Sequence, residues 1–226
     1  MKVSEIFESI QGEGTNIGKK SVFLRTALCN LTCVWCDTKY TWDWNNYDYD
    51  QEVKELSVQE IIGEITKFKS KNVVITGGEP LLQQKELEKL LDQLGKEYFF
   101  EVETNGTILP SERMLDLVNQ WNISPKTRNS KNKLVQCEMS ECYHLFTKLD
   151  NSYFKFVTEN ESDVIEIEQL IEKYSIPRAK ILLMPQADNK KALDEKADLI
   201  REIASVHNLG FTSRKHIELW ENQRGK

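Results

Sequence analysis

The chain has 226 residues, of which 39% are hydrophobic and 29% charged, a composition typical of ordinary globular proteins. It has no run of 18 apolar residues, which excludes a transmembrane helix, and its net charge of −6 makes nucleic acid an unexpected partner. Carboxylates occupy the first residues, where an export signal has its apolar segment, so we expect a cytoplasmic protein. Five cysteines cannot all pair, and the clustering of three of them predicts metal binding or catalysis.

Strand and helix patterns alternate along most of the chain. Runs rich in β-branched and aromatic residues predict strands at 21–28, 72–76, 98–103, 121–124, 153–157 and 179–184, with a weaker candidate at 211–219. A capping box at 57–60 predicts the start of a helix. Apolar stripes predict further helices at 87–94, at 162–174, at 190–207 and, as a short one, from 111. The less regular stretches 40–56 and 127–151 are expected to be loops or insertions.

This alternation predicts an α/β protein. Strands separated by helices of this length form βαβ units with a parallel sheet. Since about six repeats are too few for a closed eight-stranded barrel, we expect a single domain, 1–226, built as an open, partial βα barrel with about six parallel strands. Sheets of this kind place their chemistry at the carboxyl ends of the strands.

Three cysteines follow the first of these strands. Cys29, Cys33 and Cys36 form a C-x3-C-x2-C pattern on one predicted loop. Structural zinc needs a fourth ligand, which would have to come from far along the chain, whereas a [4Fe–4S] cluster held by three thiolates keeps one iron free for another ligand. With Trp35 before the third cysteine, the pattern resembles the radical S-adenosylmethionine (SAM) superfamily. That resemblance implies a [4Fe–4S] cluster, bound SAM and hydrogen abstraction by a 5′-deoxyadenosyl radical.

Further motifs stand at the ends of later predicted strands. Paired glycines let the backbone approach a ligand closely, and in the superfamily the Gly-Gly-Glu-Pro turn contacts the amino group of SAM. The later motifs, Glu-Thr-Asn at 103–105 and Ser-Pro-Lys at 124–126, are expected to hold the ribose and carboxylate of SAM. For Lys126 the alternative is a solvated surface lysine. The cofactor-binding candidates are Gly77, Gly78, Glu79, Glu103, Thr104, Asn105, Ser124, Pro125 and Lys126.

The amino-terminal half resembles a narrower family. The Ile-Gln-Gly-Glu-Gly block at 10–14 and the Cys-Asp-Thr block at 36–38 resemble the 7-carboxy-7-deazaguanine synthase family, and the resemblance returns at 183–185 and 216–225. It implies a carbon–nitrogen lyase that converts 6-carboxy-5,6,7,8-tetrahydropterin to 7-carboxy-7-deazaguanine, used for queuosine and related 7-deazapurines, with loss of ammonia. It also implies Mg2+, an electron donor such as flavodoxin or ferredoxin, and a homodimer.

The family resemblance also assigns site residues. Arg25 lies in an apolar strand four residues before Cys29, and its planar guanidinium suits a bidentate carboxylate contact, with a structural salt bridge as the alternative. Thr38 matches the magnesium ligand, and Mg2+ accepts few protein ligands beside water and substrate oxygens. The expected substrate contacts are Ile10, Gln11, Gly12, Arg25, Thr76 and His216.

Two other functions stay open at this point. An activase that installs a glycyl radical on a partner protein would share the cysteine pattern but leave the blocks at 10–14 and 36–38 unexplained. A non-catalytic zinc-binding module would contain zinc and no iron. Cys137 and Cys142 lie outside the motifs named above, and no function is predicted for them. No site role is predicted for the tail 220–226 either.

Overall fold

One nine-stranded sheet organises the chain, and the computed structural model describes all of residues 1–226. The strand order is β3-β1-β2-β4-β5-β6-β7-β8-β9. The first strand, β1, pairs antiparallel with β2 and β3, and every neighbouring pair from β2 to β9 is parallel. The strands are β1 (Lys2–Ile10), β2 (Lys20–Thr26), β3 (Lys54–Glu55), β4 (Asn72–Gly77), β5 (Phe99–Thr104), β6 (Gln120–Ile123), β7 (Ser152–Thr158), β8 (Ile181–Pro185) and β9 (Gly210–Phe211).

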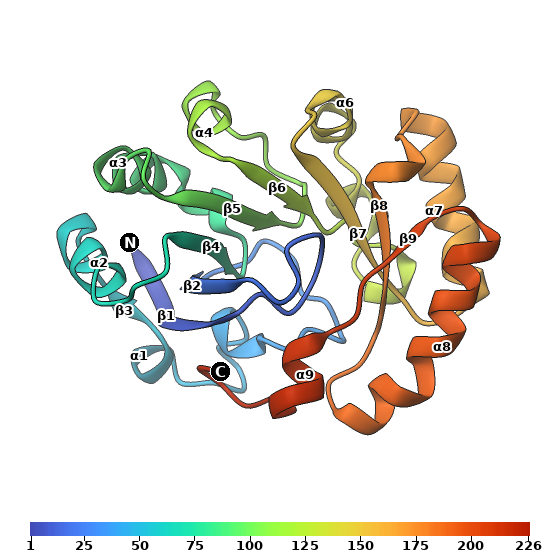
Figure 1. The fold of residues 1–226 in the computed structure, drawn as a ribbon, viewed down its shortest axis with the longest axis horizontal. Coiled ribbons are helices and arrows are strands. Elements are labelled where there is room, and N and C mark those ends of the chain that lie inside the picture. The colour runs from blue at the N-terminus through green and yellow to red at the C-terminus, as the bar shows by residue number, and fades with distance from the viewer.

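The helices cover the outer side of this sheet. Figure 1 shows the strands as an arc with α2, α3, α4, α6, α7 and α8 around its outside, while α9 and the C-terminus lie at the open side near α1. The helices are α1 (Tyr49–Glu52), α2 (Val58–Ile65), α3 (Gln84–Leu94), α4 (Glu112–Leu117), α5 (Leu134–Cys137), α6 (Ser140–Lys148), α7 (Glu161–Tyr174), α8 (Lys190–Val206) and α9 (Lys215–Trp220). None of them is both long and apolar enough to cross a membrane.

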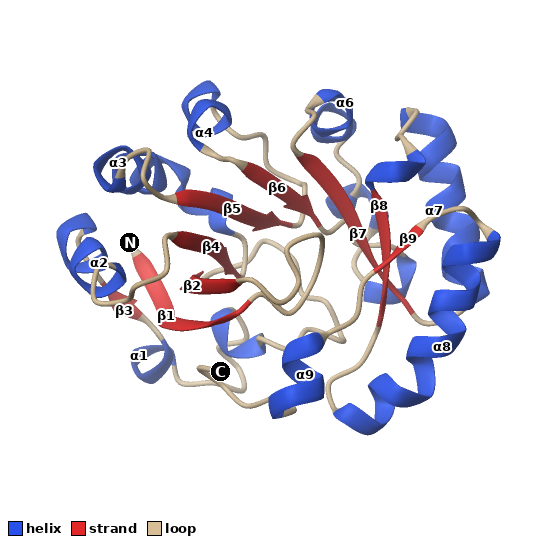
Figure 2. Cartoon of the chain, in the orientation of Figure 1, coloured by secondary structure: helices blue, strands red, loops and turns tan.

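The open, partial βα barrel expected from the sequence is confirmed. Alternation of strand and helix from β4 to β9 builds the parallel part, and loops fill the inner side of the arc (Figure 2). The capping box predicted at 57–60 is confirmed, since the Ser57 hydroxyl accepts a hydrogen bond from the Glu60 backbone N–H at 3.2 Å where α2 begins. A single domain over 1–226 stays a prediction, which the continuous sheet supports.

The structure corrects the expectations at three places. Residues 2–10 form β1, which mixes serine and glutamate with apolar residues and buries only Val3 fully, so its pattern is weak. Residues 211–219 are not a strand, because β9 ends at Phe211 and α9 follows, with Ile217 buried against Ala187 and Leu193. The stretch 127–151, expected to be a loop or insertion, contains α5 and α6, whereas 40–56 holds only short elements.

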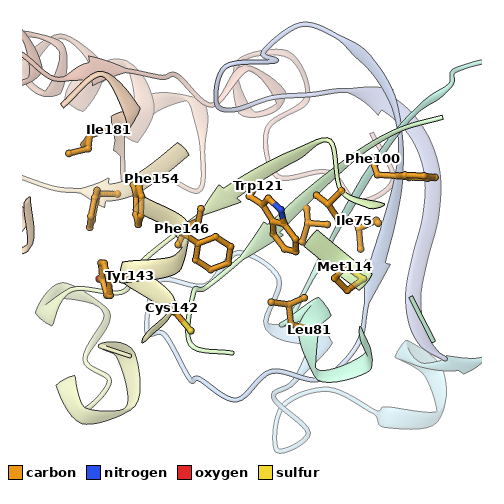
Figure 3. Packing of buried hydrophobic residues seen from close by; sticks show 14 of the residues in the cluster. Ile75, Leu81, Phe100, Met114, Trp121, Cys142, Tyr143, Phe146, Phe154 and Ile181 are labelled. Carbon is orange, nitrogen blue, oxygen red and sulfur yellow. The ribbon is translucent and has the colours of Figure 1, made fainter. Parts of the chain in front are cut away.

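Helix α6 belongs to the main apolar core. Figure 3 shows Phe146 beside Trp121 of β6, and their ring centroids lie 5.5 Å apart. Tyr143, one turn earlier, stacks on Phe154 of β7 at 6.0 Å. This helix therefore supplies aromatic side chains that fill the space between β6, β7 and the outer layer, which its short, mixed sequence does not reveal.

Replacing Phe146 by alanine is expected to lower the free energy of unfolding by about 3–5 kcal/mol, because a fully buried ring is lost and its cavity collapses only in part. Urea denaturation followed by circular dichroism measures this change. The matched control is Val135→Ala on α5, whose side chain is 79% exposed, with an expected change within about 0.5 kcal/mol. Equal stability of both variants would contradict the assignment of α6 to the core.

Candidate active site

A cavity of about 430 Å³ lies where the parallel strands end. It is lined by residues that follow β2, β4, β5 and β6, by the segment after β1, and by the carboxy-terminal tail 222–226. The sequence-predicted residues that line it are Ile10, Gln11, Gly12, Arg25, Cys29, Cys33, Cys36, Thr38, Thr76, Gly77, Gly78, Glu103, Thr104, Asn105, Ser124, Lys126 and His216. Two predicted residues, Glu79 and Pro125, do not line it.

The cysteine loop begins directly after β2. Each of its sulfurs accepts an N–H: Cys29 Sγ from the Leu31 backbone at 3.5 Å, Cys33 Sγ from Asn132 Nδ2 at 3.2 Å, and Cys36 Sγ from Trp42 Nε1 at 3.4 Å. Such donors stabilise a thiolate and therefore suit sulfurs that ligate iron.

The protonation state of the loop also follows from its surroundings. Burial raises the pKa of the Cys29 thiol to about 12, so it is a thiol in the absence of metal, and metal binding has to displace its proton. No group of three or more Cys, His, Asp or Glu side chains in this structure is arranged to hold a single metal ion. The donor set fits a [4Fe–4S] cluster because all three sulfurs line one cavity and have N–H partners.

Gly77 and Gly78 bring β4 against this loop. A Cβ on Gly77, whose φ is +135°, would lie 2.1 Å from the Thr26 carbonyl oxygen, and one on Gly78 would lie 2.0 Å from that of Leu28. Both distances are far below van der Waals contact. The glycines are therefore required for the close packing of two strand ends, in addition to leaving backbone open to the cavity.

The Glu79 carboxylate is structural. It is fully buried and accepts hydrogen bonds from Thr104 Oγ1 at 2.9 Å and from the backbone N–H groups of Asn105 at 2.7 Å and Leu81 at 3.0 Å. Burial raises its pKa despite these donors. Glu79 thus ties the end of β4 to the end of β5, which positions Thr104 and Asn105 at the cavity.

In the Ser-Pro-Lys motif, 124–126, some residues line the cavity and one is structural, as in the Gly-Gly-Glu-Pro turn. Lys126 Nζ donates to Ser124 Oγ at 2.7 Å and lies 5.2 Å from the Trp35 ring centroid, so this lysine faces the cysteine loop and is not a solvated surface residue. Pro125 is buried and lines a separate small gap beside Phe146. Only the two polar members of the motif reach the cavity.

Arg25 lies on the wall of the cavity, on β2. Its Nε donates to Glu5 Oε2 at 2.9 Å, so the structural salt bridge exists together with exposure to the cavity. Burial by itself lowers the pKa of Arg25, but the acidic neighbours Tyr40 and Glu5 outweigh that effect and raise it. The guanidinium is therefore charged at every relevant pH.

Polar side chains cross the interior of the barrel beside Arg25. Gln11 Nε2 donates to Glu101 Oε1 at 2.7 Å and to Glu103 Oε1 at 3.2 Å, and Thr76 Oγ1 donates to Glu103 Oε2 at 2.8 Å. Glu103, expected to bind the cofactor, therefore contacts residues expected to bind the substrate. Two predicted substrate contacts, Gln11 directly after β1 and Thr76 on β4, are joined through this one carboxylate.

His216 packs directly against Gly12. A Cβ on Gly12 would lie 2.1 Å from His216 Nδ1, so only glycine leaves space for the ring. Burial lowers the pKa of His216 even though the Glu13 carboxylate is near. The ring is therefore neutral near pH 7 and available as a hydrogen-bonding group at the cavity.

Four charged residues for which the sequence predicts no role form one network at the cavity. Lys155 is paired with Glu13 and lies 3.6 Å from Glu103, and Arg214 contacts Glu13 at 3.0 Å and pairs with Asp37. Burial alone would raise the pKa of Glu13, but the positive charges of Lys155 and Arg214 have the larger effect. The pKa of Glu13 is therefore well below its usual value. The signal for Lys155 was present, because it interrupts an apolar strand as Arg25 does.

Comparison with known proteins agrees with this geometry. Residues 23–137 match the Radical SAM superfamily model. The barrel of this chain, with its cysteine loop after the first parallel strand, is therefore a radical SAM fold. The structure of QueE from Escherichia coli has a TM-score of 0.71 at 24% identity, covering 95% of this chain and 94% of that one. SuiB of Streptococcus suis bound to S-adenosylmethionine has a TM-score of 0.53 at 14% identity, covering 82% and 48%.

Curated relatives give the narrower grouping. The 7-carboxy-7-deazaguanine synthase of Pyrobaculum aerophilum is 38% identical over 100% of this chain and 97% of its own length. That of Hyperthermus butylicus is 35% identical over 96% and 92%. The chain belongs to the 7-carboxy-7-deazaguanine synthase family of radical SAM enzymes.

Alanine at Cys29, Cys33 or Cys36 is expected to abolish retention of iron and sulfide, because two thiolates do not hold the cluster. Iron and sulfide analysis of anaerobically reconstituted protein, with its absorption spectrum, measures the loss. Cys142→Ala is the matched control, since Cys142 lies in the main apolar core and should leave the iron content unchanged. A wild-type protein that binds zinc and no iron would contradict the assignment.

Proposed function

We propose that this chain converts 6-carboxy-5,6,7,8-tetrahydropterin to 7-carboxy-7-deazaguanine with loss of ammonia, as a step toward queuosine and other 7-deazapurines. The observation that carries the proposal is one cavity that joins the cysteine loop to Arg25, in a chain of this family. A bidentate guanidinium suits the substrate carboxylate, and the neighbouring amide of Gln11 suits the hydrogen-bonding edge of a pterin.

Cys29, Cys33 and Cys36 would hold the [4Fe–4S] cluster, and the strand ends beside them would hold SAM. When bound together, these cofactors supply the 5′-deoxyadenosyl radical that takes hydrogen from the substrate. The residues expected at SAM are Gly77, Gly78, Thr104, Asn105, Ser124 and Lys126, with Glu79 acting through Thr104 and Asn105.

The residues of the chain bind and orient the substrate. Arg25 fixes the carboxylate, and Ile10, Gly12, Thr76 and His216 shape the remaining wall. Residues 222–226 of the tail line the cavity together with these substrate contacts. A cavity lined in part by the tail favours a small-molecule substrate over a glycyl-radical activase, which needs an open face for a protein loop.

The test is an anaerobic reaction of reconstituted enzyme with reductant, Mg2+, SAM and carboxytetrahydropterin, analysed by mass spectrometry. We expect a product formed with loss of ammonia and little net loss of SAM. Arg25→Ala should raise KM by roughly 10- to 100-fold, because a charged hydrogen-bond pair is lost, whereas Arg113→Ala, on exposed α4, should not change it. Steady formation of 5′-deoxyadenosine without this product would reject the substrate.

We propose that Thr38 provides a ligand for Mg2+. Its hydroxyl lines the cavity and lies 3.6 Å from Cys36 Sγ, next to the cysteine loop. The neighbouring carboxylate of Asp37 is already paired with Arg214, so the hydroxyl is the available oxygen there. Mg2+ readily completes its shell with water and substrate oxygens.

Thr38→Val keeps the shape of the side chain and removes the oxygen. It is expected to raise the Mg2+ concentration for half-maximal turnover by about tenfold, the effect of one lost ligand. Turnover measured over a Mg2+ titration gives this value, with Thr66→Val at the end of α2 as the control. An unchanged Mg2+ dependence would remove Thr38 from the metal site.

We propose further that an acidic electron donor such as flavodoxin or ferredoxin docks on residues 126–133. Besides Lys126, which faces the cysteine loop, this segment contains three basic residues and no acidic one, in a chain whose net charge is −6. It is joined to the cysteine loop by hydrogen bonds from Val34 N to Ser130 O at 3.1 Å and from Thr32 N to Asn132 Oδ1 at 2.9 Å. Exposed Lys131 and Lys133 form no ion pair.

The double variant Lys131→Glu with Lys133→Glu is expected to slow turnover driven by reduced flavodoxin about tenfold at low salt, since charge steering of the encounter is lost. Turnover driven by dithionite should stay unchanged. The control is Lys85→Glu with Lys89→Glu, two exposed lysines on α3. Equal slowing with both reductants would place the effect in the enzyme rather than in docking.

The homodimer and the cytoplasmic location are proposed on the family resemblance. Light scattering of the purified holoenzyme tests the first, and fractionation of cells that produce the protein tests the second.

A further inference from the structure

The guanidinium of Arg25 is held at one side and free at the other. Its side chain is 17% exposed and lines the cavity. Nε donates to Glu5, whereas the two terminal nitrogens have no hydrogen-bond partner in the protein. An arginine held through Nε presents its terminal pair of N–H groups as a fork, which matches a carboxylate approaching end-on.

Glu5 holds Arg25 through a fixed oxygen. It lies opposite Arg25 in the pairing of β1 with β2, after a register shift between Val3 and Glu5. Its Oε2 accepts from Arg25 Nε at 2.9 Å and from the hydroxyl of Tyr40 at 2.7 Å. Because the Glu5 side chain is only 14% exposed, it cannot turn to water without losing both partners.

The carboxy-terminal tail holds Tyr40 and Glu5 in place. The Arg224 guanidinium lies 3.8 Å from the centroid of the Tyr40 ring, and its Nε is 3.5 Å from Glu5 Oε1. Its terminal nitrogens donate to Glu52, at 3.1 Å from Nη1 and 2.5 Å from Nη2. The tail is thus connected to Arg25 through Tyr40 and Glu5.

We propose that Glu5 is a positioning residue that aims Arg25 at the substrate carboxylate, supported by Tyr40 and by Arg224 of the tail. It sets the preference of the cavity for a carboxylated pterin over the same ring without a carboxylate. The inference rests on the proposed function, because Arg25 is taken there as the carboxylate ligand. With the fork fixed, binding a carboxylate costs no reorientation of a long side chain.

The experiment measures dissociation constants of 6-carboxypterin and of pterin itself for the anaerobic holoenzyme, without turnover. Wild type should prefer the carboxylated ligand. Glu5→Ala should reduce that preference about tenfold by weakening 6-carboxypterin alone, since one well-aligned charged contact is lost. Glu5→Gln keeps an oxygen acceptor for Arg25 Nε and should restore part of the preference, and Tyr40→Phe should show a smaller loss than Glu5→Ala.

The control variant is Arg113→Ala, and thermal unfolding confirms that each variant is folded. If Glu5→Ala weakened both pterins equally, or kept the wild-type preference, the positioning role would be overturned while the proposed function stood. If the wild type itself bound both pterins equally, the proposed function and this inference would fail together.

Discussion

The contact between the ends of β2 and β4 is the constraint on which the site depends. Gly77 and Gly78 lie so close to the Thr26 and Leu28 carbonyl groups that no side chain fits between them. Backbone hydrogen bonds from Gly78 to Thr26 at 3.0 Å and from Glu79 to Leu28 at 2.8 Å close this contact. The cysteine loop therefore starts from a rigid point, with the turn after β4 packed directly against its first residues.

Buried charged side chains surround the cavity on the inner side of the arc, together with apolar residues such as Phe7 and Phe23. The parallel strands send apolar side chains outward to the helices, whereas inward positions carry Glu101, Glu103 and Lys155. Each charge has an opposite charge or a hydrogen-bond donor, because an unpaired charge in such a place costs several kcal/mol. The result is a cavity whose dipoles are fixed before any ligand arrives, which is the condition for electrostatic preorganisation.

The sequence predicts the repeating part of this structure well and the irregular part poorly. Strand 72–76 is buried on both faces and therefore reads as a continuous apolar run. The leucine stripe of 87–94 repeats with the period that one buried face of a helix imposes. Strand β1 lacks a clear period, because a register shift between Val3 and Glu5 interrupts its alternation and because an apolar residue, Phe7, lies on its cavity side. Helix α6 is too short to show a clear period. Ile217 belongs to α9 and packs on Leu193 of α8, although the sequence around it alternates as a strand does.

The same limit applies to the site. The cysteines and glycines are recognisable because metal ligation and close approach permit few residue types. The motif predicts a cofactor contact for Glu79 but does not tell which way its carboxylate points, and in the structure the carboxylate points to Thr104. Lys155 and Arg214 are placed by long-range pairing with Glu13, which no local pattern contains.

Strand β1 has a cavity side and a core side, and this constrains its length. Glu5 and Phe7 line the cavity, as do Ile10 and Gln11 where the strand ends, while Ile6 packs on the apolar core. Since neighbouring residues of a strand face opposite sides, deleting or inserting one residue after Glu5 would exchange the two sets and bring core side chains into the cavity. Strand β1 therefore tolerates substitution more readily than a change in length, which the loops that join the outer helices accommodate without altering the wall of the cavity.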